Sequence, residues 1–205
     1  MSITPVSITD RLREQPDLAT PRLRLVQLGP GHLAEVMTGL ADADAMRLTG
    51  TRGDFTTERV RTHLDRLPGA DDRADYAILL HDGTYVGEVV LNDLADDDRS
   101  MNYRIALAAP ALRGRGYGTE AGRAVIDWAF DVVGLHRVSL EVYRFNPAAQ
   151  RSYEKIGFRV EGVAREALHW DGAWIDAILM GMLSHDPRGA AAPSSPGSSP
   201  GSSPA

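Results

Sequence analysis

A segment rich in glycine and arginine lies near the middle of the chain, between a strand pattern and a helix pattern. Residues 113–119 read Arg-Gly-Arg-Gly-Tyr-Gly-Thr, and a stripe of apolar residues at helical spacing runs over 117–133. Glycines let the backbone turn several N–H groups toward one point, and the start of a helix adds positive potential there. The segment therefore predicts a strand–loop–helix unit that binds an anion such as phosphate, with Arg113 and Arg115 adding mobile positive charge.

Two common phosphate-binding motifs do not fit this segment. The dinucleotide fingerprint requires Gly-x-Gly-x-x-Gly after the first strand of a βαβ unit. Here the glycines stand at 114, 116 and 118, and the preceding strand patterns form a meander. A P-loop ends in Gly-Lys followed by Ser or Thr, and the segment lacks that ending. Both interpretations are excluded.

The patterns on either side of this segment predict a mixed α/β domain. Alternating apolar residues predict strands at 22–28, 75–81, 85–94, 100–108, 137–144, 158–170 and 174–183. Helical spacing predicts helices at 31–40, 57–67, 117–133 and 146–157. We therefore expect a largely antiparallel central sheet of about seven strands, with helices on both of its faces.

The length of 205 residues fits one domain together with a terminal segment that does not belong to the fold. From Arg188 onward the sequence holds Gly and Ala and then near-copies of Ser-Ser-Pro-Gly, which bury almost no apolar area. We expect an N-terminal extension at 1–20, a folded domain at 21–185 and a disordered tail at 186–205.

Charge and cysteine content narrow the class of function. A net charge of −6 argues against binding to nucleic acid or to an anionic membrane, and no apolar run approaches the ~18 residues of a membrane span. The chain has no cysteine, and its six histidines lack the paired spacing that chelates a metal. The sequence therefore favours a cytoplasmic enzyme or binding protein that needs no metal.

Two separate motifs resemble those of the GNAT family of N-acetyltransferases. Arg113, Gly116 and Gly118 match in order the family's pyrophosphate loop, Gln/Arg-x-x-Gly-x-Gly/Ala. Asn146, followed by Tyr-Glu-Lys-Ile-Gly-Phe at 153–158, resembles the family's second signature. Gly-Thr-Glu-Ala at 118–121 and Glu-Gly at 161–162 are similar to the RimJ/RimL-like branch. The resemblance covers roughly residues 20–184.

This resemblance implies a GNAT-like fold, acetyl-CoA as the donor and direct transfer of an acetyl group to a primary amine in a ternary complex. The acceptor would be a protein N-terminus or a small-molecule amine, and a homodimer is compatible with the family. Backbone groups of two splayed strands would hold the pantetheine arm. The implied donor-binding residues are Ile105, Leu107, Arg113, Gly114, Arg115, Gly116, Tyr117, Gly118, Thr119 and Asn146.

Tyr153 stands where the family carries the tyrosine that protonates the departing CoA thiolate. It also falls on an apolar stripe with Ala149 and Ile156, so an ordinary core position is the alternative. Two classes of function remain open. An intact second signature favours an enzyme. The absence of a carboxylate on the strand before the pyrophosphate loop favours instead a non-catalytic acyl-CoA-binding module on the same fold.

Many relatives carry a glutamate base on the strand before the pyrophosphate loop, but residues 101–104 hold no carboxylate. Asn102 stands about where that glutamate is expected. Glu88 on the neighbouring strand is the replacement candidate, since an unpaired carboxylate is not expected to point into an apolar core. An edge or solvent-facing position is its alternative. We expect Asn92 and Asn102 to contact the acceptor.

Overall fold

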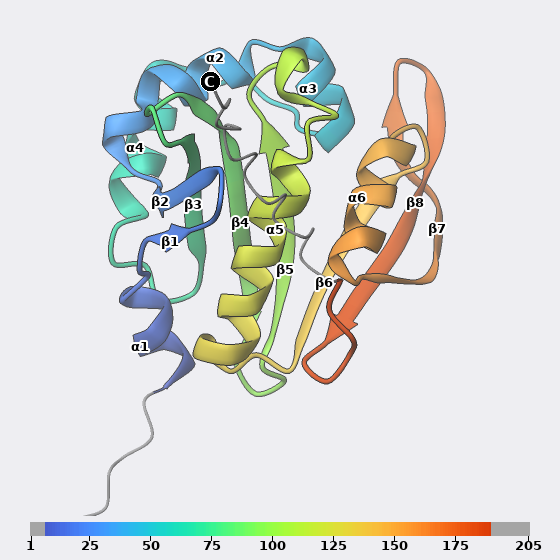
Figure 1. Ribbon diagram of the computed structural model, residues 1–205. Coiled ribbons are helices and arrows are strands. Elements are labelled where there is room, and N and C mark those ends of the chain that lie inside the picture. Colours follow the sequence, from blue (N-terminus) through green and yellow to red (C-terminus); the bar gives the residue numbers. More distant parts are fainter. Residues whose placement is uncertain (1–6, 190–205) are drawn as a thin grey trace, which may run out of the picture.

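One continuous sheet of eight strands runs through the computed structural model, which describes residues 7–189 (Figure 1). The strand order is β1-β2-β3-β4-β5-β6-β8-β7, and all neighbours are antiparallel except β5 and β6. The strands are β1 (Leu18–Ala19), β2 (Leu23–Gln27), β3 (Ala74–Leu80), β4 (Tyr85–Ala95), β5 (Ser100–Leu107), β6 (Arg137–Tyr143), β7 (Arg159–Trp170) and β8 (Ala173–Leu183). The seven expected strands are confirmed, and the two-residue β1 is additional.

Within the described residues, six α-helices cover the two faces of this sheet. They are α1 (Ile8–Arg13), α2 (Leu33–Leu40), α3 (Ala43–Thr49), α4 (Thr57–Arg66), α5 (Tyr117–Trp128) and α6 (Pro147–Ile156). A π-helical turn at Ala129–Val133 extends α5, and Gly134 ends it in the left-handed conformation with φ 85°. Sequence spacing predicted α2, α4, α5 and α6. It missed α1 and α3, which are the two shortest helices.

The two faces of the sheet carry separate apolar cores because strand side chains alternate between faces. On β3, Tyr76 and Ile78 enter the larger core, which α1, α5 and α6 cover. Ala77 and Leu79 enter a smaller core beneath α2 and α4. Figure 1 shows α5 and α6 lying across the same face of the sheet. The mixed α/β architecture with helices on both faces is therefore confirmed.

Strands β5 and β6 separate soon after they meet. Their parallel pairing covers three residue pairs, from Ser100 opposite Arg137 to Asn102 opposite Ser139. Both strands continue beyond these pairs, β5 to Leu107 and β6 to Tyr143. The sheet therefore opens between them at the end that carries the glycine-rich loop.

The expected N-terminal extension at 1–20 is wrong for the part that the structure describes. Leu12 of α1 is fully buried in the larger core, and Arg11 donates a hydrogen bond to the carbonyl of Val132. Leu18 pairs with Leu25 in the sheet. These residues belong to the domain, and their short elements gave no periodic pattern to detect.

The expected start of the tail at 186 is also wrong. The guanidinium of Arg188 reaches both carboxylate oxygens of Asp131 at 2.6 Å and Asp127 at 2.9 Å, and it lies 5.5 Å from the ring centroid of Phe130. The backbone N–H of Gly189 donates to the carbonyl of Ile156 at 3.0 Å. The remainder of the expected tail, 190–205, lies outside the described residues.

No helix within residues 7–189 is both long and apolar enough to cross a membrane.

We predict that Arg188→Ala lowers the free energy of unfolding by about 1 kcal/mol, which is the upper end of what exposed ion pairs contribute. The reason is that one side chain holds two aspartates of the α5 segment. Urea denaturation measures the change. Arg165→Ala is the matched control, since Arg165 forms no side-chain hydrogen bond with the described residues. Equal midpoints for both variants would contradict a stabilising role.

Candidate active site

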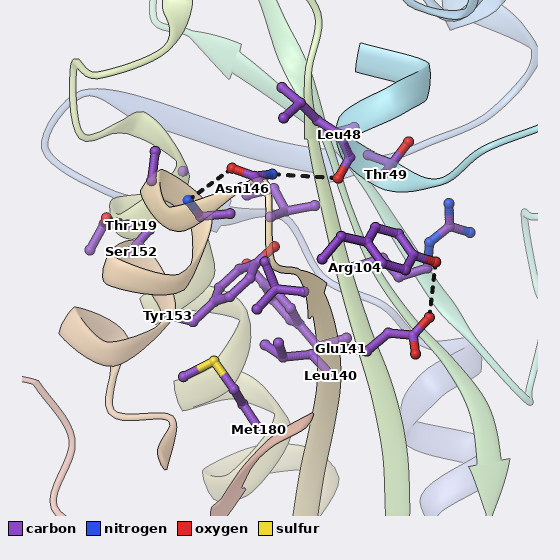
Figure 2. A pocket seen from close by; sticks show the side chains of 18 of the residues that line it. Leu48, Thr49, Arg104, Thr119, Leu140, Glu141, Asn146, Ser152, Tyr153 and Met180 are labelled. Carbon is purple, nitrogen blue, oxygen red and sulfur yellow. Dashed lines mark hydrogen bonds between the residues drawn. The ribbon is translucent and has the colours of Figure 1, made fainter. Parts of the chain in front are cut away.

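A cavity of about 860 Å³ fills the opening between β5 and β6 (Figure 2). We call it the main cavity. Its walls come from β5, the loop before α5, β6, α6 and the end of α3, so segments far apart in the sequence meet there. The residues labelled in Figure 2 are Leu48, Thr49, Arg104, Thr119, Leu140, Glu141, Asn146, Ser152, Tyr153 and Met180.

The backbone of β5 faces this cavity at Ile105 and Leu107. Ala108 donates a hydrogen bond to the carbonyl of Val86 on β4 at 2.9 Å. Hydrogen-bonded pairs alternate along an antiparallel ladder, so Ala106 also directs its backbone groups toward β4. Ile105 and Leu107 direct theirs the other way, into the opening. Both residues line the main cavity, and the sequence predicted both as backbone contacts.

The glycine-rich loop forms a cradle of N–H groups beside the main cavity. Gly114 and Gly116 have positive φ angles of 73° and 81°, and Gly116 is the N-cap of α5. The first backbone N–H that bonds back into the helix is that of Glu120, to the carbonyl of Gly116 at 3.0 Å. The N–H groups of the preceding turn therefore lack intrahelical acceptors and can bind an anion.

The side chains of this loop differ in what they face. Arg113, Gly114, Gly116, Gly118 and Thr119 line the main cavity. Arg115 and Tyr117 are not among its lining residues. The expectation that both arginines supply mobile charge is wrong for Arg113, whose guanidinium is held by Asp42 at 3.1 Å. Asp42 is the N-cap of α3, one of the two helices that sequence spacing missed.

Two polar contacts fix α6 at the edge of the main cavity. The Asn146 side chain accepts from the N–H of Ala149 at 3.1 Å, and its amide donates to the carbonyl of Leu48 on α3 at 3.4 Å. The hydroxyls of Thr119 and Ser152 lie 2.7 Å apart and join α5 to α6. Asn146 is thus both a helix cap and a lining residue, and Ser152 is a lining residue that the sequence analysis did not identify.

Tyr153 combines a core ring with a hydroxyl at the main cavity. Its ring meets Tyr103 edge to face at 5.9 Å and Phe158 at 6.2 Å, and the residue is 8% exposed. Its hydroxyl forms no hydrogen bond with the described residues, yet Tyr153 lines the cavity. Burial raises the pKa of Tyr153 to about 12, although the charge of Arg104 opposes this. The phenol therefore keeps its proton at neutral pH.

Glu88 lies in the wall that the main cavity shares with a second cavity. This second cavity, of about 370 Å³, is lined by residues of α2, α3, α4 and β4, and Glu88 lines both. The edge position considered for Glu88 is wrong, because β4 is flanked by β3 and β5. Burial and the charge of Asp75 raise the pKa of Glu88, against the opposing charges of Arg104 and Arg73.

Asn92 and Asn102 contact each other across β4 and β5. The Asn102 amide donates to the Asn92 side-chain oxygen at 3.0 Å, and the Asn92 amide donates to Asp93 at 3.1 Å. Asn102 lines the main cavity, whereas Asn92 is not among its lining residues. The contact of Asn92 with the acceptor therefore stays a prediction.

The described residues contain no group of three or more His, Asp or Glu side chains that could hold a metal ion.

Comparison with known proteins identifies the family. The model of the acetyltransferase (GNAT) domain matches residues 22–159, more than half of the chain, so the chain belongs to the GNAT family. It is 40% identical over 76 residues to the probable N-acetyltransferase YjcK of Bacillus subtilis, a match that covers 37% of this chain and 42% of that protein. It is 31% identical over 104 residues to the spermidine N(1)-acetyltransferase of Escherichia coli, covering 51% and 55% of the two chains.

The matched region thus spans about half of the length of these curated relatives. A solved structure shares the fold over most of the chain: spermidine N-acetyltransferase from Vibrio cholerae in complex with CoA and spermine. Its TM-score is 0.76 at 22% identity, and the match covers 82% of this chain and 98% of that one.

We predict that Gly118→Asp abolishes the rise in melting temperature that acetyl-CoA causes by binding the folded state. The new carboxylate would stand among the N–H groups of the cradle and repel phosphate. The fold should persist, because a Cβ at this position meets only the Ile105 side chain, at 3.7 Å, and an acidic residue suits the first turn of a helix.

Gly118→Ala is the matched control and should keep the shift. Thermal denaturation with and without acetyl-CoA measures both variants. A full shift in the Gly118→Asp protein would remove the loop from the binding site.

Proposed function

We propose that the protein is an N-acetyltransferase that transfers an acetyl group from acetyl-CoA to a primary amine by direct attack in a ternary complex. One observation carries this proposal: a phosphate cradle, open backbone groups on β5 and an unpartnered Tyr153 hydroxyl all face the main cavity. An anion site alone would fit many ligands. The combination with a buried proton donor fits a thioester donor.

Successive parts of the main cavity match the pyrophosphate, the pantetheine arm and the thioester of acetyl-CoA. The cradle at 113–119 supplies N–H groups for the pyrophosphate. The open backbone groups of Ile105 and Leu107 suit the amides of the pantetheine arm, as an extended peptide is held by a free strand edge. Asn146 and Tyr153 of α6 line the same space. The thioester would then lie near the Tyr153 hydroxyl.

Glu88 is the proposed general base. An amine titrates near ~10, so it must lose a proton before it can attack the thioester carbonyl at neutral pH. A glutamate whose pKa is raised by burial is a stronger base than an exposed one. Because Glu88 lines both cavities, an acceptor in the second cavity can reach a donor in the main cavity past this side chain.

The proton balance of the reaction closes with these two groups. One proton of the acceptor ammonium passes to Glu88, and the neutral nitrogen then forms the new bond to the acetyl carbon. The bond between carbon and sulfur breaks, Tyr153 gives its proton to the departing thiolate, and the nitrogen loses its second proton, which restores the Tyr153 phenol. Glu88 releases its proton to solvent.

The carboxylates of the second cavity, which Arg59, Arg73 and Arg104 also line, offer partners for a cationic acceptor. Arg73 donates two hydrogen bonds of 2.6 and 2.7 Å to the Asp75 carboxylate, so the charges of this pair neutralise each other. Glu35 also lines this cavity, and one of its carboxylate oxygens is buried without a hydrogen-bond partner among the described residues. Relatives named as spermidine acetyltransferases support a small polyamine, and a relative named as a putative ribosomal acetyltransferase supports a protein N-terminus.

We also propose a branch of the family, an oligomeric state and a cellular location for this protein. The sequences at 118–121 and 161–162 support a RimJ/RimL-like branch. A homodimer is supported by exposed apolar side chains on the β7–β8 hairpin, where Trp174 is 62% and Val160 50% exposed. The lack of cysteine is compatible with a cytoplasmic location.

The experiment that tests the proposal is a thiol-release assay with acetyl-CoA and a panel of amines that includes spermidine and a short peptide with a free N-terminus. Release that depends on one of these amines supports the enzyme. A rise in melting temperature with acetyl-CoA, but no release with any amine, would instead indicate the non-catalytic acyl-CoA-binding module.

We predict that Tyr153→Phe lowers turnover by at least about tenfold, a floor below the ~10²–10⁴-fold that general acid catalysis typically contributes. Acetyl-CoA affinity and stability should change little, because the hydroxyl has no partner among the described residues and the ring stays. Steady-state kinetics and thermal denaturation measure these effects. Tyr103→Phe is the control, since its hydroxyl is buried next to Gly122. Equal turnover in all three proteins would leave Tyr153 as a core residue.

We predict that Glu88→Gln lowers turnover at neutral pH. Turnover of this variant should recover at high pH, where the acceptor amine has already lost its proton. In the unaltered protein, kcat/KM should rise with pH through the raised pKa of Glu88, because only the ionised carboxylate accepts a proton. A pH profile of kcat/KM measures this limb. Glu141→Gln, which removes another carboxylate of the main cavity, is the control. A loss in the Glu141 variant alone would overturn the assignment of Glu88.

A further inference from the structure

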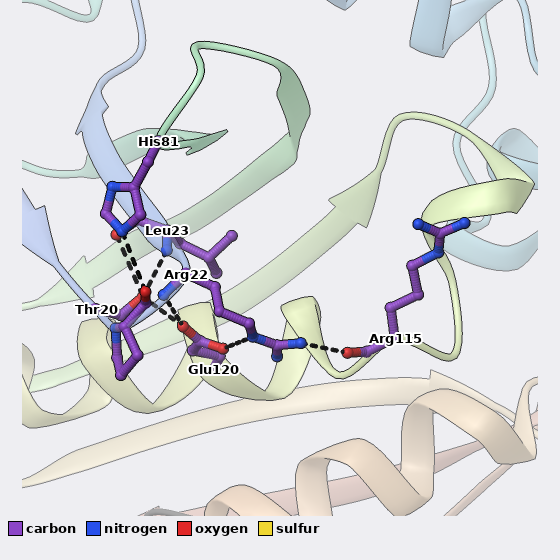
Figure 3. Close-up of polar contacts among 7 residues, drawn as sticks. Thr20, Arg22, Leu23, His81, Arg115 and Glu120 are labelled. Atoms are coloured by element: carbon purple, nitrogen blue, oxygen red, sulfur yellow. Dashed lines mark hydrogen bonds and ion pairs between the residues drawn. The ribbon is translucent and has the colours of Figure 1, made fainter. Parts of the chain in front are cut away.

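We propose that Arg22, which lies just before β2, is a positioning residue for the donor's pyrophosphate. This inference rests on the proposed function, because it concerns the loop assigned to acetyl-CoA. Arg22 is 93 positions away from Arg115 in the sequence, yet its side chain bridges the sheet to the loop (Figure 3). Neither motif of the family resemblance includes it.

Arg22 contacts three successive residues of the loop. Its Nη1 donates to the backbone carbonyl of Arg115 at 2.9 Å. Its guanidinium lies 4.8 Å from the ring centroid of Tyr117. Its Nη2 would be 3.2 Å from a Cβ placed on Gly116. The Arg22 side chain therefore lies against the loop at residues 115–117, where α5 begins.

The backbone at Arg22 is itself held in place. Leu23 is fully buried, and its N–H bonds to the Thr20 hydroxyl at 3.0 Å. The carbonyl of Pro21 lies 3.2 Å from the His81 ring nitrogen. Figure 3 shows these contacts converging on the short segment before β2. The guanidinium is thus anchored to the sheet.

The same arginine neutralises a carboxylate close to the cradle. Glu120 of α5 accepts from Arg22 Nε at 2.6 Å, from the Arg22 backbone N–H at 2.9 Å and from the Thr20 hydroxyl at 2.6 Å. Burial raises the pKa of Glu120, but the hydrogen bonds from Thr20 and Arg22 outweigh it, so the pKa lies below its usual range. Glu120 is therefore charged, and without Arg22 it would repel the phosphates.

Preorganisation explains why this bridge matters for binding. Gly114 and Gly116 give the loop more backbone conformations than other residues would allow. A loop that is already held in its binding conformation loses less entropy when the ligand arrives. Arg22 therefore favours the pyrophosphate-binding conformation and removes the opposing charge of Glu120, without touching the reacting atoms.

The test compares two donors, acetyl-CoA and S-acetyl-pantetheine, which lacks the pyrophosphate. Arg22→Met should raise the KM for acetyl-CoA by about tenfold, as for one lost hydrogen bond to a charged group. It should leave the KM for S-acetyl-pantetheine and the kcat unchanged. Arg24→Met is the matched control: Arg24 is exposed on β2, two residues further on, and forms no side-chain hydrogen bond with the described residues.

Two further variants separate the bridge made by Arg22 from its neutralisation of Glu120. Arg22→Met combined with Glu120→Gln should recover part of the lost affinity, because the uncompensated carboxylate is gone. If Arg22→Met unfolds, Arg22→Lys replaces it, since lysine keeps the charge but cannot bridge Glu120 and the Arg115 carbonyl. It should raise the KM for acetyl-CoA by a smaller factor.

An unchanged KM for acetyl-CoA, or an equal rise for both donors, would overturn the role of Arg22. Failure of the proposed function gives a different result: the unaltered protein would then release no thiol from either donor with any amine.

Discussion

The separation of β5 from β6 is the constraint on which the rest of the site depends. Buried backbone N–H and C=O groups require hydrogen-bond partners, and a sheet supplies them through its neighbouring strands. Here the pairing stops after three residue pairs, while β5 continues to Leu107. The unpaired groups at Ile105 and Leu107 face a cavity, so an extended ligand with amides can complete the ladder. The cofactor arm would thus take the place of a strand segment.

The opening is maintained by packing on both of its sides. Gly122 of α5 lets α6 approach closely, since a Cβ there would meet the Ile156 side chain at 2.5 Å and the Tyr103 hydroxyl at 2.7 Å. The Thr119–Ser152 hydroxyl contact joins the same two helices at the cavity. On the other side, Asp42 holds Arg113 and Leu48 holds Asn146. The cavity is therefore enclosed by contacts between elements distant in the sequence.

Burial acts on the two proposed catalytic groups in the same direction and suits each to its task. It raises the pKa of Tyr153, which keeps the phenol protonated and able to donate to the thiolate. It also raises the pKa of Glu88, which makes the carboxylate a stronger proton acceptor. Arg104 opposes both shifts. Burial of each group thus favours a protonated phenol as the acid and a more basic carboxylate as the base.

The sequence by itself determined the features that depend on neighbouring residues. Glycine spacing identified the cradle at 113–119, apolar periodicity identified seven strands and four helices, and the second signature located Tyr153 on α6. Only the tertiary structure decided which partners the charged side chains contact. It paired Arg113 with Asp42, docked Arg188 on α5, brought Arg22 to the loop and set Glu88 between two cavities. These contacts join residues far apart in the chain, so no local pattern encodes them, and only the packed sheet brings them within reach.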